Sequence, residues 1–214
     1  MLELSEIFYS IQGESSFAGF PCIFIRLAGC NLHCHYCDSL QSFQVKETLT
    51  CKEIMDRIAL YPACNLVEIT GGEPLLQEDV YNLMVMLNQN NFQIMLETNG
   101  SLDLEKVPSY VHIIVDVKCP GSGYEDCFLL KNLIHLDTCR DEIKFVLTGR
   151  KDFDWARNFI GDHKLESYQI LFSPVITALS PSELAQWILD EGIKVRLQLQ
   201  LHKMIWPGHE GWRS

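Results

Sequence analysis

Three cysteines, Cys30, Cys34 and Cys37, stand in a C-x3-C-x2-C spacing on a short segment that follows an apolar stretch. Thiolates this close in sequence can converge on one metal centre. A structural zinc ion would need a fourth ligand, which His33 or His35 could supply, but no second ligand pair is visible. A [4Fe–4S] cluster bound by three cysteines leaves one iron open to a ligand, and the spacing favours this centre over zinc. Redox chemistry of a dithiol is a weaker interpretation because it needs no third cysteine.

A second polar motif, Thr-Gly-Gly-Glu-Pro at residues 70–74, follows another apolar stretch. Glycines at the carboxyl end of a strand let a ligand approach the backbone, and Glu73 can accept hydrogen bonds from a ligand's ammonium group. Taken alone, the motif is equally typical of a turn. Polar residues end further predicted strands near residues 97–100, 116–118 and 172–175, and ligand groups gather at such ends. We therefore expect a ring of ligand contacts.

The cysteine motif, with the aromatic Tyr36 before its last cysteine and with residues 70–74 following it, resembles the signature of the radical S-adenosylmethionine superfamily. The resemblance implies that Cys30, Cys34 and Cys37 bind a [4Fe–4S] cluster whose open iron chelates the amino and carboxylate groups of S-adenosylmethionine. One electron would then cleave this cofactor to methionine and a 5′-deoxyadenosyl radical. It also implies cofactor contacts by Tyr36, Asp38, Gly72, Glu73, Asp116, Val117, Lys118, Phe172, Ser173, Pro174 and Val175.

Within that superfamily the chain resembles the 7-carboxy-7-deazaguanine synthase family over essentially its whole length. The matching segments are 6–15 (EIFYSIQGES), 36–39 (YCDS), 116–118 (DVK) and 200–203 (QLHK). The resemblance implies a radical ring contraction of 6-carboxy-5,6,7,8-tetrahydropterin to 7-carboxy-7-deazaguanine with release of ammonia, in queuosine and 7-deazapurine biosynthesis. S-adenosylmethionine would be regenerated. Mg²⁺ would bind the Ser39 hydroxyl, which without the resemblance is more typical of a loop or helix-cap serine.

The same resemblance implies substrate contacts by Ile11, Gln12, Gly13, Glu14, Arg26 and Thr70. A pterin edge offers donors and acceptors that a glutamine, a backbone and a carboxylate can pair, and the substrate carboxylate suits an arginine. Arg26 also needs a partner because it lies in an apolar strand, whereas Glu14 alone would be a surface charge. Further expected contacts near the end of the chain are Gln200, His202 and Pro207. In some family members the chain stops at this proline, whereas here residues 208–214 follow it.

Strands that alternate with helices must position these residues. Apolar, β-branched runs predict strands at 22–28, 66–70, 92–97, 112–117, 142–147 and 169–172. Helices are predicted from Thr50 to about residue 61, at 78–88, at 151–160 and from Ser180 to Gly192. Alternating apolar and polar residues at 193–202 predict a last strand, whose polar face is either solvated or lines a ligand cavity.

This order predicts an α/β fold with a mostly parallel sheet. The units are too few for a closed eight-unit barrel, so we expect an incomplete, open (β/α) barrel with helices outside, and a single domain over residues 1–214.

Composition limits the setting of this chemistry. The chain has 214 residues, 47% of them hydrophobic, and a net charge of −11, which excludes a basic surface for nucleic acid. No apolar run is long enough to span a membrane, and the acidic N-terminus lacks the basic region of a signal peptide. Nine cysteines cannot all pair. We therefore expect a cytoplasmic protein, and the family resemblance implies a homodimer and a flavodoxin- or ferredoxin-like electron donor.

Two other functions remain open at this stage. One is a radical S-adenosylmethionine activase, which would share the cysteines and residues 70–74 but would make a glycyl radical on a partner protein. The other is a non-enzymatic zinc-binding interaction module. The colour of an anaerobic preparation distinguishes them, because an iron–sulfur protein is brown and a zinc protein is colourless.

Overall fold

A computed structural model describes residues 1–61 and 63–206. Its described strands form one nine-stranded sheet in the order β3-β1-β2-β4-β5-β6-β7-β8-β9. Every pair from β2 to β9 is parallel, while β1 pairs antiparallel with both β2 and β3. The sheet does not close, because β3 and β9 are its two edges. The predicted open, mostly parallel barrel is therefore confirmed. The strands are β1 (Leu2–Ile11), β2 (Pro21–Leu27), β3 (Glu47–Leu49), β4 (Leu66–Gly71), β5 (Gln93–Thr98), β6 (His112–Asp116), β7 (Glu142–Leu147), β8 (Gln169–Pro174) and β9 (Arg196–Leu197).

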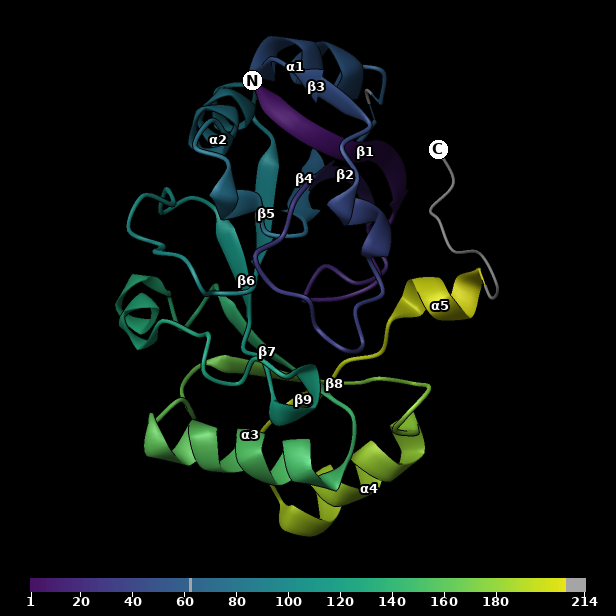
Figure 1. The fold of residues 1–214 in the computed structure, drawn as a ribbon, viewed down its shortest axis with the longest axis vertical. Helices are drawn as coiled ribbons and strands as arrows, with labels where there is room; N and C mark the ends of the chain where they lie inside the picture. The colour runs from purple at the N-terminus through teal and green to yellow at the C-terminus, as the bar shows by residue number, and fades with distance from the viewer. Residues whose placement is uncertain (62, 207–214) are drawn as a thin grey trace.

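The helices lie along the sheet in two groups. Figure 1 shows α1 (Cys51–Ile58) and α2 (Val80–Gln89) beside the first strands, and α3 (Arg150–Asp162) and α4 (Pro181–Glu191) beside the last ones. The short α5 (Leu201–Ile205) lies apart from these four. None of the helices among the described residues is long and apolar enough to cross a membrane.

Two of the predicted helix starts have the expected capping interactions. Thr50 and Glu53 form a reciprocal capping box at α1, which satisfies two backbone amides that the first helical turn leaves without partners. Ser180 accepts a hydrogen bond from the Glu183 amide at α4, and Gly192 ends that helix in the left-handed conformation. Local sequence alone therefore defines the start of α1 and both ends of α4.

Aromatic packing joins the last strands to their helices. Phe145 on β7 and Phe172 on β8 are fully buried, and Phe153 of α3 packs edge-to-face on Phe172 with ring centroids 5.7 Å apart. Trp187 of α4 extends the contact to Phe153. Burial of each phenylalanine contributes about 1.5–3 kcal/mol, so this face of the sheet is a core and the opposite face is left for the site.

The ends of the sheet differ from the sequence-based expectations. Strands β1 and β3 were not predicted, because their residues mix polar and apolar types without a clean alternation. The strand predicted at 193–202 is wrong for most of its length, since only Arg196–Leu197 pairs with β8 and residue 201 already starts α5. The Leu201 amide instead donates to the Gly13 carbonyl, so tertiary contact overrides the period-two pattern.

Candidate active site

A cavity of about 1040 Å³ opens at the carboxyl ends of the parallel strands. All three motif cysteines line it, together with residues from the loop after β1, from β2, β4, β5, β6, β7 and from the chain after β9. Its size is at the upper end of the usual range for small-molecule sites, which suits two ligands beside a metal centre. The sequence-predicted residues that line it are Gln12, Glu14, Arg26, Cys30, Cys34, Tyr36, Cys37, Asp38, Ser39, Thr70, Gly72, Asp116, Lys118, Pro174, Val175, Gln200 and His202.

Backbone hydrogen bonds hold the cysteine loop against residues 70–74. Gly29 has a positive φ of 89°, and its amide donates to the Ser42 carbonyl at 2.7 Å. The Glu73 amide donates to the Gly29 carbonyl at 2.9 Å. A side chain on Gly72 would collide with the Gly29 carbonyl and with Cys30. The two motifs are therefore in direct contact, and glycine at position 72 makes this approach possible.

The three thiols of the motif all line the cavity. Cys30, Cys34 and Cys37 are all free and half-buried, and burial raises the pKa of Cys30 and Cys34. Within the described part of the chain, no three His, Cys, Asp or Glu side chains converge on one ion position. Three cysteines can supply one thiolate each to three irons of a [4Fe–4S] cluster, which leaves the fourth iron open.

The two histidines between the cysteines are placed elsewhere. His33 stacks on Phe43 with ring centroids 4.8 Å apart, and the His35 amide donates to the Ser122 carbonyl. Neither histidine is among the residues that line the cavity. The arrangement therefore gives no support to a histidine as a fourth ligand.

Glu73 occupies a structural position. Its side chain is fully buried, does not line the cavity, and accepts from the Thr98 hydroxyl and from the Asn99 and Leu75 amides at 2.7–3.0 Å. These bonds join the end of β4 to the end of β5. The carboxylate oxygens are thus already engaged, and the motif presents Gly72 to the cavity.

On the cofactor side, Asp116 and Lys118 form an ion pair of 2.8 Å at the end of β6. The second oxygen of Asp116, Oδ1, is buried and has no partner among the described residues. Burial alone would lower the pKa of Lys118, but Asp116 and Cys34 raise it. A buried acceptor without a donor fits a polar ligand that brings one.

The remaining expected cofactor contacts divide into two groups. Pro174 and Val175 line the cavity, whereas Val117, Phe172 and Ser173 are buried outside it. Phe172 in particular belongs to the aromatic core on the other face of the sheet. Side-chain contact from this group to a ligand in the cavity is therefore restricted to Pro174 and Val175.

Arg26 and Thr70 occupy paired positions on β2 and β4. Arg26 Nε donates to Glu6 at 2.8 Å, which supplies the partner that an arginine in an apolar strand requires. No described residue bonds to its two terminal nitrogens, so the guanidinium can still pair with a carboxylate ligand. Thr70 donates its hydroxyl to Glu97 Oε2 at 3.1 Å.

The loop after β1 enters the cavity and is held there by Gln12. The Gln12 side chain donates to Glu68 and accepts from the Glu14 amide at 3.0 Å, so its amide group is used within the protein. Gly13 packs so closely on His202 that a side chain at position 13 would collide with the imidazole. Ile11 and Gly13 do not line the cavity, but they set the path of the loop.

Sequence reasoning missed two charged residues of this region, Glu68 and Lys144, whereas Glu97 belongs to the polar stretch at 97–100 that was expected to contact a ligand. The Lys144 ammonium lies 3.0 Å from Glu14, contacts Glu97, and is 3.9 Å from Asp116. Burial alone would raise the pKa of Glu97, but Lys144 lowers it. We call Gln12, Glu14, Glu68, Glu97 and Lys144 the cavity floor. The sequence contained a signal for both missed residues. Glu68 and Lys144 are charged residues within apolar strands, which is the same feature that identified Arg26 as a candidate.

The chain after β9 covers one side of the cavity. Gln200 donates to Glu14 at 2.8 Å, and Lys203 donates to Asp38 at 2.7 Å. Partial burial alone would raise the pKa of Asp38, but Lys203 lowers it to about 2. Burial and Lys203 lower the pKa of His202 to about 4, so the imidazole is neutral at pH 7. Pro207 lies outside the described residues.

Ser39 lines the cavity just after the cysteine loop. It precedes the short helix η1 (Leu40–Phe43), but its side chain makes no capping hydrogen bond there. Its hydroxyl donates only weakly to Asp38, at 3.3 Å. A structural cap therefore does not account for this serine.

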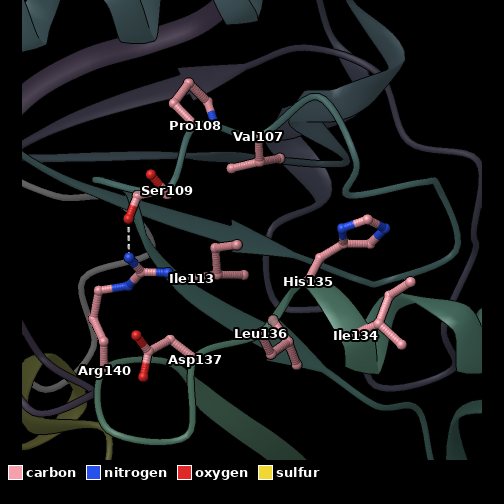
Figure 2. Close-up of a pocket in the computed structure, with 9 residues that line it drawn as sticks. All are labelled: Val107, Pro108, Ser109, Ile113, Ile134, His135, Leu136, Asp137 and Arg140. Carbon is pink, nitrogen blue, oxygen red and sulfur yellow. Dashed lines mark hydrogen bonds between the residues drawn. The ribbon is translucent and has the colours of Figure 1, made fainter.

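A second, smaller cavity of about 400 Å³ lies near the start of β6 (Figure 2). Arg140 donates to the Ser109 carbonyl across it and also pairs with Asp141 at 2.7 Å. None of the residues predicted to do chemistry lines this cavity. Its charges are satisfied within the protein, so the larger cavity is the candidate active site.

The open barrel and the three-cysteine cavity define a radical S-adenosylmethionine protein, and a family model described as the radical SAM superfamily matches residues 24–118. The 7-carboxy-7-deazaguanine synthase of Chlorobaculum tepidum is 44% identical over 96% of this chain and 94% of its own length. That of Koribacter versatilis is 42% identical over 96% and 97%. The chain belongs to the 7-carboxy-7-deazaguanine synthase family.

The solved structures agree with the fold. The crystal structure of QueE from Escherichia coli superposes with a TM-score of 0.72 and 22% identity, and covers 92% of this chain and 93% of that one. The structure of Streptococcus suis SuiB bound to S-adenosylmethionine superposes with a TM-score of 0.54 over 79% of this chain and 44% of that one, at 15% identity. Both likenesses concern the fold alone.

Proposed function

We propose that the protein converts 6-carboxy-5,6,7,8-tetrahydropterin into 7-carboxy-7-deazaguanine with release of ammonia, in the biosynthesis of queuosine and other 7-deazapurines. The relatives that span nearly the whole chain are named for this product. The observation that carries the proposal is one cavity that is lined both by the three free cysteines and by the charged cavity floor.

The cluster end would hold the cofactors. Cys30, Cys34 and Cys37 would bind the [4Fe–4S] cluster, and S-adenosylmethionine would lie against Gly72 and Asp116. When bound, these groups supply the electron and the radical that start the reaction. The chain's own part is to keep the two motifs in contact through the Glu73–Gly29 backbone bond.

The substrate would lie between Arg26 and the cavity floor. The free end of the Arg26 guanidinium would pair with the substrate carboxylate. Lys144 pairs with Glu14 and Glu97 and lowers the pKa of Glu97, which gives this part of the cavity fixed charges before substrate binds. His202, neutral at pH 7, can donate or accept a hydrogen bond without adding charge.

We also propose that Mg²⁺ binds between the Ser39 hydroxyl and the substrate carboxylate. Magnesium accepts few protein ligands and retains water, so a single hydroxyl beside a ligand carboxylate is sufficient. The missing capping bond of Ser39 supports this assignment.

The setting of the enzyme is part of the proposal. Nine free cysteines support a reducing cytoplasm. We propose a flavodoxin- or ferredoxin-like protein as the electron donor. We propose a homodimer, to be tested by analytical ultracentrifugation, and one domain over residues 1–214, because all described strands belong to a single sheet.

The decisive experiment is anaerobic incubation of the reconstituted protein with S-adenosylmethionine, a reductant and 6-carboxy-5,6,7,8-tetrahydropterin. We expect 7-carboxy-7-deazaguanine and ammonia in equal amounts, with many turnovers per S-adenosylmethionine. Cofactor cleavage without this product would contradict the proposal. A glycyl radical on an added protein would favour an activase instead.

A further inference from the structure

Most buried carboxylates of the described chain have a hydrogen-bond or ion-pair partner for each of their two oxygens. These fully engaged carboxylates are Glu73, Asp141, Glu142 and Asp152. Two buried carboxylates, Glu68 and Asp116, have one oxygen without a partner among the described residues. Asp116 pairs with Lys118 on the cofactor side, which leaves Glu68 as the buried carboxylate of the cavity floor with a vacant oxygen.

The half-buried carboxylates of the floor offer no such acceptor. Glu14 pairs through one oxygen with Lys144 and through the other with Gln200. Glu97 contacts Lys144 with one oxygen and accepts from Thr70 with the other. On the floor, Glu68 therefore has the vacant acceptor position.

Glu68 lines the cavity and is only 6% exposed. Its Oε2 accepts from Gln12, and Gln12 is fixed in turn because its own oxygen accepts from the Glu14 amide. The glutamine cannot rotate to serve a ligand without breaking both bonds. Glu68 Oε1 is thus the floor atom left to meet a ligand.

The position of Glu68 suits one end of a fused bicyclic ligand. Arg26 pairs with Thr70, and Glu68 lies two residues earlier on the same strand, about 6.6 Å nearer its start. If the carboxylate of a pterin pairs with Arg26, the pyrimidine ring at the other end of the pterin would lie near Glu68. That ring presents adjacent N–H donors, its 2-amino group and N3–H, which match a carboxylate.

We propose that Glu68 is a specificity-determining residue, which accepts hydrogen bonds from the 2-amino group and N3–H of the pterin and so selects a 2-amino over a 2-oxo ring. This inference rests on the proposed function and deepens it. Burial and the neighbouring Glu97 raise the pKa of Glu68 to about 8 in the free protein. Donors from a ligand would restore the ionised form, as hydrogen bonds to a carboxylate do.

The test compares two ligands on three proteins. The ligands are 6-carboxy-5,6,7,8-tetrahydropterin and its analogue with oxygen in place of the 2-amino group, and the proteins are wild type, Glu68→Gln and Gln12→Met. We expect wild type to bind the 2-amino ligand roughly tenfold to a hundredfold more tightly. Glu68→Gln should lose or reverse this preference, because an amide can donate to the 2-oxo group and accept from N3–H.

The control separates specificity from positioning. Gln12→Met keeps Glu68 but removes its partner, so it should weaken both ligands alike. If Glu68→Gln also weakens both ligands alike, Glu68 acts only through Gln12 and the proposal is overturned. A wild type that binds the two ligands equally overturns it without any variant. Product formation tests the proposed function separately. If the wild type forms product from the 2-amino ligand, the proposed function stands even where the Glu68 proposal is overturned. If it forms no product, the proposed function is rejected.

Discussion

At the cluster end of the cavity, three cysteines lie within residues 30–37 and are held by backbone hydrogen bonds to residues 70–74. The cavity floor instead draws Glu68, Glu97 and Lys144 from three separate strands, and side-chain bonds hold them: an ion pair joins Lys144 to Glu97, and a hydrogen bond joins Gln12 to Glu68. The first arrangement is local and tolerates change in distant side chains. The second is cooperative, because Lys144 neutralises Glu14 and Glu97, which come from elsewhere in the chain.

This contrast predicts that substitutions at the cluster end remove the metal centre, whereas those at the floor spare the metal and affect the substrate. The predictions below run from the largest expected effect on activity to the smallest, and a prediction on stability alone comes last.

Cys34→Ala should abolish cluster binding and activity, since three thiolates are the minimum that the open-iron site uses. Iron content and the brown absorbance of the anaerobic protein measure the loss. Cys139→Ala is the matched control, because Cys139 is exposed and does not line the cavity. A Cys34 variant that retained full iron would contradict the ligand assignment.

Lys144→Met should leave Glu14 and Glu97 as uncompensated carboxylates. We expect a loss of about 3–5 kcal/mol in the free energy of unfolding and roughly hundredfold weaker pterin binding, with iron content unchanged. Denaturant unfolding and binding titration measure the two effects.

The control for Lys144 is Lys131→Met, which breaks an exposed pair with Asp103 and should cost about 0–1 kcal/mol. Similar small losses in both variants would show that the floor is not a cooperative charge network.

Gly13→Ala should displace the loop after β1, because a side chain there collides with the His202 imidazole. We expect the KM for the pterin to rise about tenfold to a hundredfold, with the affinity for S-adenosylmethionine little changed. Gly161→Ala serves as control, since nothing lies within 4 Å of its added carbon and it should stabilise α3 by about 0.5–1 kcal/mol. Equal KM values for Gly13→Ala and wild type would separate the loop from the substrate site.

Ser39→Ala should lower the apparent affinity for Mg²⁺ roughly tenfold while leaving the cluster and cofactor cleavage intact. Ser39→Thr keeps the hydroxyl and should behave like wild type. Activity against Mg²⁺ concentration compares the three proteins. An unchanged Mg²⁺ response in Ser39→Ala would remove this residue from the metal site.

The last prediction concerns the dependence of stability on pH at Glu68, and not activity. Because its pKa is raised to about 8 in the folded protein, folding favours its protonated form, and this contribution is lost as pH rises from about 4.5 to 8. The Glu68→Gln side chain cannot ionise, so the variant does not lose this contribution. Between pH 4.5 and 8 its melting temperature should therefore rise relative to that of wild type, by about 2–4 °C for each kcal/mol of unfolding free energy that wild type loses.

The gain should level off above pH 8 and disappear near pH 4, where wild-type Glu68 is protonated in both states. The other groups near Glu68, namely Glu14, Glu97 and Lys144, are present in both proteins and largely cancel. A pH-independent difference would mean that Glu68 is ionised throughout.

The sequence predicted most elements that local patterns define. The capping box at Thr50 and the start and stop of α4 have the expected residues because each signal acts within one helical turn. The edges of the sheet were not predictable in this way. A segment at the edge of a sheet forms a strand only if a neighbouring strand is in place to pair with it. This applies to β3 and to the residues expected as a last strand, and the alternation of apolar and polar residues does not determine whether such a neighbour is present.

By itself, the sequence determined the cysteine spacing, residues 70–74 and Arg26, which are contiguous or stand out against an apolar strand. The tertiary structure alone decided which acceptors stay vacant. Glu73 and Gln12 have the right types for ligand contact, yet their side chains bond within the protein, whereas Glu68 keeps one oxygen without a described partner. Hydrogen-bond capacity is shared among side chains far apart in sequence, so only the folded arrangement shows where a ligand must complete it.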